Sequence, residues 1–373
     1  MNFFNLERQF KLIKRGLLKN FEINFKKGDF IQGKNVKILE KKLLTYSDSK
    51  YCLSCGNGTD AIRIAIKALK IPKNSHIIVP SYTWISTASS VVESDMVPIF
   101  CDVDENSFLM SVEKIKETLK HAKENKVNVK AIITVDLFGN PVEYNKIYKL
   151  CKSKNIFFIS DAAQSFGAKQ FGNYIGSRSC DVMTTSFFPT KNIGGYGDGG
   201  ALFFNNKYTY NTAKIYAKNG QKVNGEIVSS GINSRLDTMQ ASVLLEKLKL
   251  LSKETVLKKK IFLLYKKLLN KNYFEFQKIN KNYQSSFSVM TLKINKNIKR
   301  NLLTKFLEKE RIPYKVYYEN SIHKSRFYKT YPMVKMDITE KLSRTTISLP
   351  IFPYLKNNEV KKICNKINFF FNS

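Results

Sequence analysis

The sequence predicts an α/β fold built around a largely parallel β-sheet, and three observations support this class. Between about residues 50 and 205, short apolar runs typical of buried strands alternate with segments whose apolar residues recur at helical spacing. Such alternation is the pattern of parallel strands that are connected by helices and covered on both faces. After about residue 235 the alternation stops and a long helical stretch follows, which indicates a second, smaller α+β region.

The elements of the large region are predicted from these runs. The predicted strands are residues 76–80 (HIIVP), 97–104 (VPIFCDVD), 130–139 (KAIITVDLFG), 155–164 (NIFFISDAAQ), 182–189 (VMTTSFFP) and 200–205 (GALFFN). The predicted helices between them are residues 59–70, 111–125 and 143–155. Residues 167–177 (GAKQFGNYIGS) are rich in glycine and aromatic residues and are predicted to form a hairpin.

The second region begins with a predicted helical stretch over residues 236–271. It continues with the segments 285–294, 299–312 and 314–319 and a final helix. We expect a large domain over residues 1–250, including the N-terminal segment, and a small C-terminal domain over 251–373. No linker rich in Pro, Gly or Ser separates the two, so we expect them to pack together.

The net charge of +33 raises the question of a nucleic-acid partner, because a basic surface binds phosphate by releasing counterions. Only nine of the 63 basic residues are arginine, and the lysines are spread along the whole chain rather than clustered in one arm. A compositional bias towards Lys and Asn explains this distribution better. We therefore expect no nucleic-acid partner, although the charge can help to attract an anionic substrate.

Other composition features favour a soluble cytoplasmic protein without a membrane partner. No apolar run approaches the roughly 18 residues of a membrane span, and the first 16 residues lack the continuous apolar stretch of a signal peptide. The six cysteines are spread through the chain, and the CLSC pair at 52–55 has no second pair with which to form a zinc site. We expect small buried thiols, with neither disulfides nor a metal.

A glycine-rich loop at residues 185–201 (TSFFPTKNIGGYGDGGA) holds a single lysine, Lys191. A P-loop does not explain it, because that motif places its glycines before the lysine and a Ser or Thr directly after it. Here the glycines follow Lys191, and the next residue is Asn192. A chemistry other than that of a P-loop must therefore explain the lysine amine in this loop.

Other polar residues follow the predicted strands. Trp84, the single tryptophan, comes after the first predicted strand, and Asp161 comes after IFFIS. Ligands of open parallel sheets bind beyond the carboxyl ends of the strands, so Asp161 and Lys191 are expected at one edge. Gly58 and Thr59 begin a predicted helix, and backbone N–H groups at a helix start bind anions well.

Pyridoxal phosphate is a ligand that needs these groups together. It requires a lysine for covalent attachment and proton transfer, here Lys191, and a carboxylate against its pyridine nitrogen, here Asp161. The helix start at Gly58 and Thr59 suits its phosphate, with Ser186 as a hydroxyl donor. Two further residues complete the set, namely Trp84 for stacking on the ring and Gln164 for the ring hydroxyl.

Each of these residues, taken alone, also has a plain structural explanation. Asp161 could cap the turn after a strand, Trp84 could pack in the core, and Lys191 could be a solvated surface lysine. The loop NGTD at 57–60 could be an ordinary helix cap. Their order along the chain favours the cofactor, but the residues by themselves leave both explanations open.

At these same residues the chain resembles the DegT/DnrJ/EryC1/StrS family of nucleotide-sugar aminotransferases, which are fold-type I enzymes dependent on pyridoxal phosphate. The similarity runs in the family's order from about residue 28 onward. It lies in the blocks GNGTDA (56–61), IIVPSYTWISTA (77–88), PIFCDVD (98–104), VDLFGNP (135–141), ISDAAQSFGA (159–168), SFFPTKNIGGYGDGGA (186–201), GINSRLDTMQA (231–241) and ISLPIFP (347–353).

The resemblance implies a role for each of these residues. Lys191 would bind the cofactor covalently and Asp161 would pair with the pyridine nitrogen. Gln164 would meet the ring hydroxyl, and Trp84 would stack on the ring. The phosphate would be bound by Gly58, Thr59 and Ser186.

The resemblance also implies a homodimer with sites shared across the interface. The asparagine of the family's N-x-R-L-D block reaches the phosphate in the neighbouring subunit's site, and Asn233 matches it. Arg235 is then a candidate contact for the sugar nucleotide, with a salt bridge to Asp237 as its alternative role.

The implied reaction is a ping-pong transfer in which glutamate gives its amino group, 2-oxoglutarate leaves, and a keto sugar linked to a nucleoside diphosphate is aminated. The substrate residues depart from the family's pattern, because many relatives have His-Tyr-Pro where this chain has Tyr317, Tyr318 and Glu319. Tyr318 keeps the tyrosine, Tyr317 replaces the histidine, and His323 matches a later histidine that could equally be structural. The block pattern looks most like members that aminate 3-keto UDP-N-acetylhexosamine derivatives for cell-surface polysaccharides.

Three alternatives accompany this interpretation. A C4-aminating enzyme for 4-keto-6-deoxy sugars would share nearly all the motifs. The dehydratase branch of the family is disfavoured, because its members replace the lysine with histidine, whereas this chain keeps Lys191. A non-catalytic or regulatory relative is also disfavoured, because all the expected cofactor groups are present.

Overall fold

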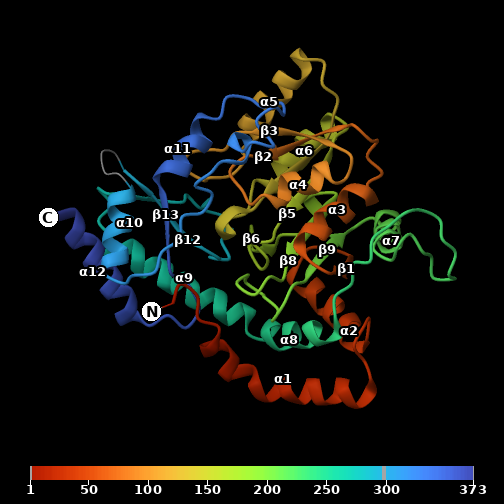
Figure 1. The fold of residues 1–373 in the computed structure, drawn as a ribbon, viewed down its shortest axis with the longest axis horizontal. Coiled ribbons are helices and arrows are strands. Elements are labelled where there is room, and N and C mark those ends of the chain that lie inside the picture. Colours follow the sequence, from red (N-terminus) through yellow and green to blue (C-terminus); the bar gives the residue numbers. More distant parts are fainter. Residues whose placement is uncertain (1, 296–299, 373) are drawn as a thin grey trace.

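A seven-stranded sheet forms the centre of the computed structural model, which describes residues 2–295 and 300–372 (Figure 1). The strand order is β1-β9-β8-β5-β4-β2-β3, and β9 is antiparallel to both of its neighbours. The strands are β1 (Tyr51–Cys55), β2 (His76–Pro80), β3 (Val97–Cys101), β4 (Val129–Val135), β5 (Phe157–Asp161), β8 (Val182–Ser186) and β9 (Gly200–Phe204).

The six predicted strands are confirmed, with identical bounds for 76–80 and shorter strands for the other five, and so is the mostly parallel character of the sheet. The edge strand β1 was not predicted. Its five residues pair with β9, with Tyr51 opposite Phe204, so its place depends on a strand that lies far away in the sequence. The cysteine pair that bounds CLSC lies in this strand, and all six cysteines of the chain are buried free thiols, as expected.

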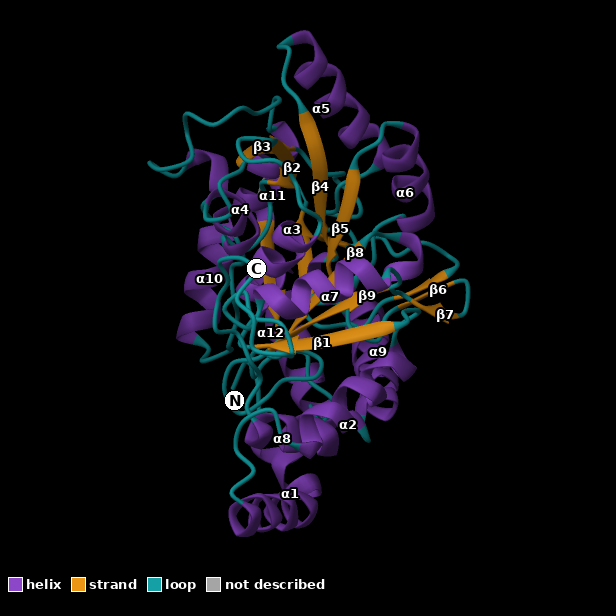
Figure 2. Cartoon of the chain, turned by 90° about the vertical axis from the view of Figure 1, so that its right-hand side faces the viewer, coloured by secondary structure: helices purple, strands orange, loops and turns teal. Residues whose placement is uncertain are grey.

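Helices cover both faces of the sheet (Figure 2). Successive residues of a strand point to opposite faces, and since both sets are apolar here, each face packs against helices. On one face Ile78 and Ile132 pack with residues of α2 (Lys34–Leu43), α5 (Val112–Glu124), α6 (Tyr144–Ser153) and α8 (Thr238–Leu248). On the other face Ile77 and Ile133 pack with residues of α3 (Gly58–Ala68), α4 (Ser86–Val92) and α7 (Lys207–Tyr216). The predicted helices 59–70, 111–125 and 143–155 correspond to α3, α5 and α6.

A second core belongs to a small antiparallel sheet with the order β10-β12-β13. Its strands are β10 (Phe274–Phe276), β12 (Met290–Ile294) and β13 (Thr346–Leu349), and its helices are α9 (Leu251–Leu268), α10 (Arg300–Lys309) and α12 (Asn357–Asn372). Helix α11 (Asp337–Thr345) precedes β13. Lys299, the first residue of the predicted segment 299–312, lies outside the described residues. The division of the chain at residue 250 stays a prediction.

One detail of this region differs from the sequence prediction. The stretch 236–271 is two helices rather than one, because α8 ends at Leu248 and α9 starts at Leu251. Helical spacing of apolar residues continues across residues 249 and 250, so it cannot reveal where one helix ends and the next begins. The segment 314–319, for which no element type was predicted, contributes an isolated bridge between Lys315 and Ser348.

The predicted hairpin at 167–177 is confirmed as β6 (Lys169–Gln170) and β7 (Asn173–Tyr174), and β11 (Tyr283–Gln284) pairs with β6. Short 3-10 turns occupy Leu44–Tyr46, Leu137–Gly139, Ser177–Ser179 and Ile322–Lys324. Across the described ranges, no helix is long and apolar enough to cross a membrane.

The N-terminal helix α1 (Glu7–Lys27) runs beside α8 at the bottom of Figure 1 and bridges the two cores. At its start, Arg8 forms two hydrogen bonds to the carboxylate of Glu359 on α12, at 2.8 and 2.9 Å. The N-terminal segment therefore fastens the small sheet region to the large one.

Candidate active site

The carboxyl ends of neighbouring strands bring the predicted site residues together. Asp161 is the last residue of β5, and Ser186 is the last residue of β8, the strand that pairs with β5. Helix α3 begins at Gly58 beside Ser186, because a Cβ atom on Gly58 would lie 2.7 Å from the Cβ of Ser186. Only glycine permits this approach of the helix start to the strand end, and the result is a cradle lined by main-chain N–H groups.

Asp161 is a buried carboxylate with few partners. It is 8% exposed and accepts hydrogen bonds from the Ala163 N–H at 3.0 Å and the Thr87 hydroxyl at 3.4 Å. Burial raises the pKa of Asp161, while the Ala163 hydrogen bond, the charge of Lys191 and the Thr87 hydrogen bond lower it. A buried acid of this kind is stabilised as an anion by a cation placed against it.

Lys191 lies in the loop after β8, partly buried and within electrostatic reach of Asp161. Its main-chain N–H donates to the carbonyl of Phe188 at 2.9 Å. Burial lowers the pKa of the Lys191 amine, and the charge of Asp161 raises it. A lowered pKa increases the fraction of neutral, nucleophilic amine near neutral pH.

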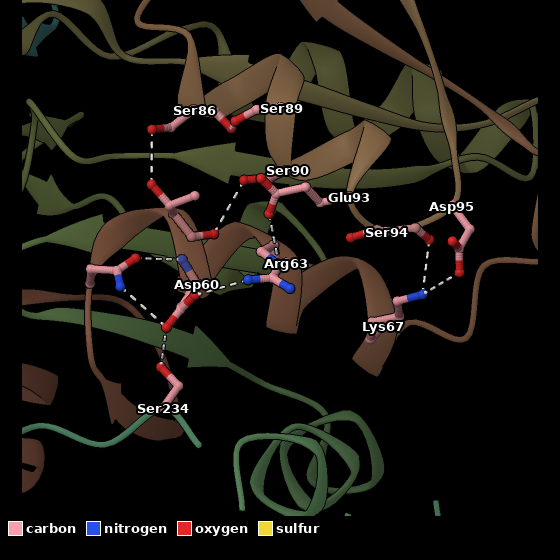
Figure 3. A network of polar contacts seen from close by, with 12 residues as sticks. Asp60, Arg63, Lys67, Ser86, Ser89, Ser90, Glu93, Ser94, Asp95 and Ser234 are labelled. Atoms are coloured by element: carbon pink, nitrogen blue, oxygen red, sulfur yellow. Dashed lines mark hydrogen bonds and ion pairs between the residues drawn. The ribbon is translucent and has the colours of Figure 1, made fainter. Parts of the chain in front are cut away.

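The start of α3 is held by a polar network (Figure 3). The Asn57 side chain caps the helix by accepting from the Asp60 N–H at 2.7 Å. Thr59 donates through its hydroxyl to Ser86 at 2.8 Å, and Ser234 donates to the Asp60 carboxylate at 2.7 Å. These bonds fix the helix start while the first N–H groups of α3 remain without partners inside the helix.

Gln164 is anchored at both ends of its amide. Its Oε1 accepts from the Phe138 N–H at 2.8 Å, and its Nε2 donates to the Tyr318 hydroxyl at 3.1 Å. The second hydrogen of Nε2 is available to a ligand oxygen. Gln164 therefore links the strand edge to the residues contributed by the C-terminal part of the chain.

Trp84 does not pack in the core. Its side chain is 63% exposed in this chain, and its carbonyl accepts from the N–H of Thr87 near the start of α4. The core-packing alternative for Trp84 is thereby wrong, and an open aromatic face lies next to the strand edge.

Asn233 and Arg235 are both exposed, whereas Ser234 between them is buried against the start of α3. Ser234 also accepts from the Gly56 N–H at 2.9 Å. Among the residues that the structure describes, no ion pair joins Arg235 to Asp237, so the alternative role of Arg235 has no support. Both side chains point outward from a segment that is pinned to the chain's own α3.

The three C-terminal candidates differ in their surroundings. Tyr318 is partly buried, with its ring stacked on Phe138 at a centroid distance of 6.3 Å and an interplanar angle of 16°, and its backbone φ is 63°. Tyr317 is partly buried against the same Phe138 ring at 6.2 Å. His323 is 5% exposed, with Nδ1 2.7 Å from the Ser81 hydroxyl and Nε2 3.5 Å from Glu340.

This environment favours the structural role of His323, because both ring nitrogens have protein partners and burial lowers the pKa of the imidazole. The histidine joins the end of β2 to α11. Tyr317 and Tyr318 lie closer to the strand edge through their contacts with Phe138 and Gln164.

Sequence reasoning missed Thr87, Ser234 and Asn192. Thr87 bonds Asp161, Ser234 bonds Asp60, and the Asn192 amide donates to the Gln164 carbonyl at 3.1 Å. Each lies within three residues of a predicted site residue, and this closeness in sequence is the feature that could have pointed to them. The polar partner of each, however, is distant in sequence and could be assigned only from the fold.

Taken together, the fold and the site define a pyridoxal-phosphate-dependent aminotransferase of fold-type I. The residues present fit the cofactor: a partly buried amine near a buried carboxylate, next to a helix start cleared of side chains by Gly58. The chain belongs to the DegT/DnrJ/EryC1/StrS aminotransferase family, whose model matches residues 13–368.

Similar proteins support this assignment. A UDP-2-acetamido-2-deoxy-3-oxo-D-glucuronate aminotransferase of Pseudomonas aeruginosa is 31% identical over 367 residues, which cover 98% of each chain. A protein of Geobacillus stearothermophilus named pleiotropic regulatory protein is 30% identical over 369 residues, 98% of this chain and 97% of that one. The crystal structure of a family aminotransferase from Brucella abortus superposes with a TM-score of 0.94 at 33% identity over the full length of both chains.

Proposed function

We propose that this enzyme transfers the amino group of glutamate to a keto sugar linked to a nucleoside diphosphate, with a 3-keto UDP-N-acetylhexosamine derivative as the best candidate. The observation that carries the proposal is the pairing of Lys191 with buried Asp161 beside the start of α3. The name of the Pseudomonas relative, an aminotransferase for a 3-oxo UDP-sugar acid, supports the choice of substrate.

In this proposal the chain's residues hold the cofactor as follows. Lys191 Nζ is the point of attachment, the Asp161 carboxylate faces the ring nitrogen, and the N–H groups at Gly58 and Thr59 bind the phosphate. Ser186 accepts from the Phe188 N–H at 3.2 Å and keeps its own hydrogen for a phosphate oxygen. Trp84 covers one face of the ring, and the Gln164 amide meets its hydroxyl.

When bound, the cofactor supplies a protonated ring that withdraws electrons from the carbon that loses its proton. Asp161 keeps that ring protonated, because a buried carboxylate near a cation is stabilised in its charged form. Lys191 Nζ takes the proton from one carbon and returns it to the other, as base and then as acid. Burial lowers the pKa of this amine, which suits both directions of proton transfer near neutral pH.

The sugar nucleotide would lie between the strand edge and the segment that holds Tyr317 and Tyr318, with Arg235 of a second copy on the diphosphate. Asn233 and Arg235 are exposed in the single chain, which supports a homodimer in which each copy completes the other's site. The excess of 63 basic over 30 acidic residues would attract an anionic nucleotide. The assignments of His323 to substrate and of the enzyme to the cytoplasm carry less support.

Two other functions have some support. A C4-aminating enzyme would use the same site with the sugar turned, and no residue discussed above distinguishes it. A regulatory role is suggested by the name of the Geobacillus relative. Retention of Lys191, Asp161 and the Gly58 cradle argues against a purely non-catalytic protein.

The test is the visible absorption spectrum of the purified protein with pyridoxal phosphate, before and after glutamate is added without a sugar. A yellow band that shifts with glutamate supports the donor half of the reaction, and a panel of UDP- and dTDP-linked keto sugars then identifies the acceptor. A colourless protein that glutamate does not change would contradict the proposal and favour the regulatory alternative.

A further inference from the structure

Helix α9 places a buried lysine next to the loop that carries Lys191. Lys258 is 5% exposed, and its Nζ donates to Oδ1 of Asn192 at 2.5 Å. Asn192 directly follows Lys191, although 66 residues separate it from Lys258. A buried ammonium is costly unless it is bonded and its charge is compensated, so this contact calls for an explanation.

The charge of Lys258 is compensated on its own helix. Glu254 lies one turn earlier, is 3% exposed, and accepts from the Gln9 amide at 2.9 Å and the Tyr354 hydroxyl at 2.7 Å. Burial lowers the pKa of Lys258 to about 8, and the charge of Glu254 raises it. The carboxylate of Glu254 thus favours the charged form of Lys258.

Asn192 uses the other end of its amide to tie the Lys191 loop to two further segments. Its Nδ2 lies 3.1 Å from the Gln164 carbonyl, 3.3 Å from the Phe166 carbonyl and 2.6 Å from the Ser286 hydroxyl. Gln164 and Phe166 belong to the turn that follows Asp161. One side chain therefore joins the amine-bearing loop to the carboxylate-bearing turn.

Lys258 decides which way this amide faces. An ammonium only donates hydrogen bonds, so Asn192 must present its oxygen to Lys258 and its NH₂ group to the two carbonyls. Without Lys258, the Asn192 oxygen loses this donor. The flipped amide, which would turn its oxygen toward the two carbonyls, is then no longer disfavoured by a cation next to its NH₂ group.

We propose that Lys258 is a positioning residue for Lys191: through Asn192 it holds the Lys191 loop in register with the turn after Asp161. The active-site amine is then placed by α9, which also packs in the core of the small sheet. The functional part of this inference rests on the proposed role of Lys191, whereas the positioning itself can be tested without cofactor.

The experiment is hydrogen–deuterium exchange of residues 187–196 in the cofactor-free chain, read by mass spectrometry. Lys258→Met should speed exchange of this segment by about tenfold, as expected for the loss of one buried hydrogen bond to a charged donor. Lys259→Met, an exposed neighbour on the same helix, should leave exchange unchanged. Lys258→Arg retains a charged donor and should keep the exchange of residues 187–196 close to that of the parent. This variant tests the proposal even if Lys258→Met folds poorly.

A double variant separates this mechanism from general loosening. In an Asn192→Ala background, Lys258→Met should add no further exchange, because the contact is already absent. Unchanged exchange in Lys258→Met, or an undiminished effect in the Asn192→Ala background, would overturn the proposal. With cofactor and substrates, Lys258→Met should lower kcat about tenfold with little change in KM for glutamate. If the exchange results hold while Lys191→Ala stays active, the proposed function fails and the positioning stands.

Discussion

The site has two halves that are built in different ways. The strand-edge half consists of Asp161 and Ser186, with Lys191 in the loop that follows, and the places of the first two follow from main-chain pairing: β5 and β8 are adjacent and parallel, so their carboxyl ends lie together. The wall half, around Tyr317 and Tyr318, has no such ladder. Beyond the single bridge of Lys315 to Ser348, it is held by side chains: Tyr318 stacks on Phe138, meets the Tyr82 ring edge-on and accepts a hydrogen bond from Gln164.

This difference teaches where side-chain changes should matter. At the strand edge, a substitution removes chemistry but leaves the frame in place, because the sheet holds the backbone. At the wall, a substitution can shift the wall itself, because side chains are what hold it. Tyr318, at φ 63°, sits in a conformation that non-glycine residues rarely adopt without such support. The following predictions separate these two behaviours.

The largest effect is expected for Lys191→Ala. Because Nζ is the proposed attachment point and proton carrier, turnover should fall by about 10⁴-fold, the upper range for loss of a proton-transfer group. Borohydride reduction followed by mass spectrometry should find no covalently bound cofactor, while the melting temperature of the cofactor-free chain stays near that of the parent. Lys207→Ala, at the exposed start of α7, is the matched control and should behave like the parent. Retention of a reducible adduct in Lys191→Ala would remove Lys191 from its role.

Asp161→Asn should give the next largest loss. The amide keeps the shape of the side chain but removes the charge that stabilises a protonated ring, so kcat should fall by about 10²-fold or more. The same change removes the charge that raises the pKa of Lys191, so that pKa should fall further. Both effects can be measured from the pH dependence of the glutamate half-reaction. Near-normal transamination by this variant would contradict the assignment of Asp161.

Tyr318→Phe should have a smaller and more selective effect. The ring still stacks on Phe138, but the hydrogen bond to Gln164 at 3.1 Å is lost, which costs about 1 kcal/mol. We expect KM for the sugar nucleotide to rise about fivefold, with the glutamate half-reaction nearly unchanged, as measured by steady-state and single-turnover kinetics. Equal losses in both half-reactions would show that the wall supports the strand edge as well.

The smallest effect concerns stability and pH. Burial raises the pKa of Asp161 above its ordinary value of 3.8, so the folded chain holds this proton to a higher pH than the unfolded chain does. The contribution of Asp161 to the free energy of unfolding is therefore fully present below pH 3.8 and is lost as pH rises through the raised pKa. Asparagine does not titrate. In urea unfolding, the free energy of unfolding of the cofactor-free parent should therefore fall with rising pH relative to that of Asp161→Asn. If the difference between the two free energies did not change with pH, the prediction would be wrong.

The predicted elements show what local pattern can and cannot reveal. The six apolar runs became strands because a strand buried on both faces needs continuous apolar residues, which holds for the five parallel strands and also for the antiparallel β9. This requirement is visible in the local sequence. Strand β1 was not predicted, because it forms by pairing with β9, which lies far away in the sequence. The break between α8 and α9 was not predicted, because the apolar spacing continues through Lys249 and Leu250 although α8 ends at Leu248 and α9 begins at Leu251.

The sequence by itself determined the fold class, the order of the strand-edge residues and the family, because these depend on local periodicity and on contiguous motifs at strand ends. Only the tertiary structure decided which groups hold those residues. The bonds of Thr87 to Asp161, Ser234 to Asp60 and Lys258 to Asn192 each join segments far apart in the chain. Such contacts leave no local pattern, since the partner of a buried polar side chain is chosen by the packing of whole elements and not by its neighbours in sequence.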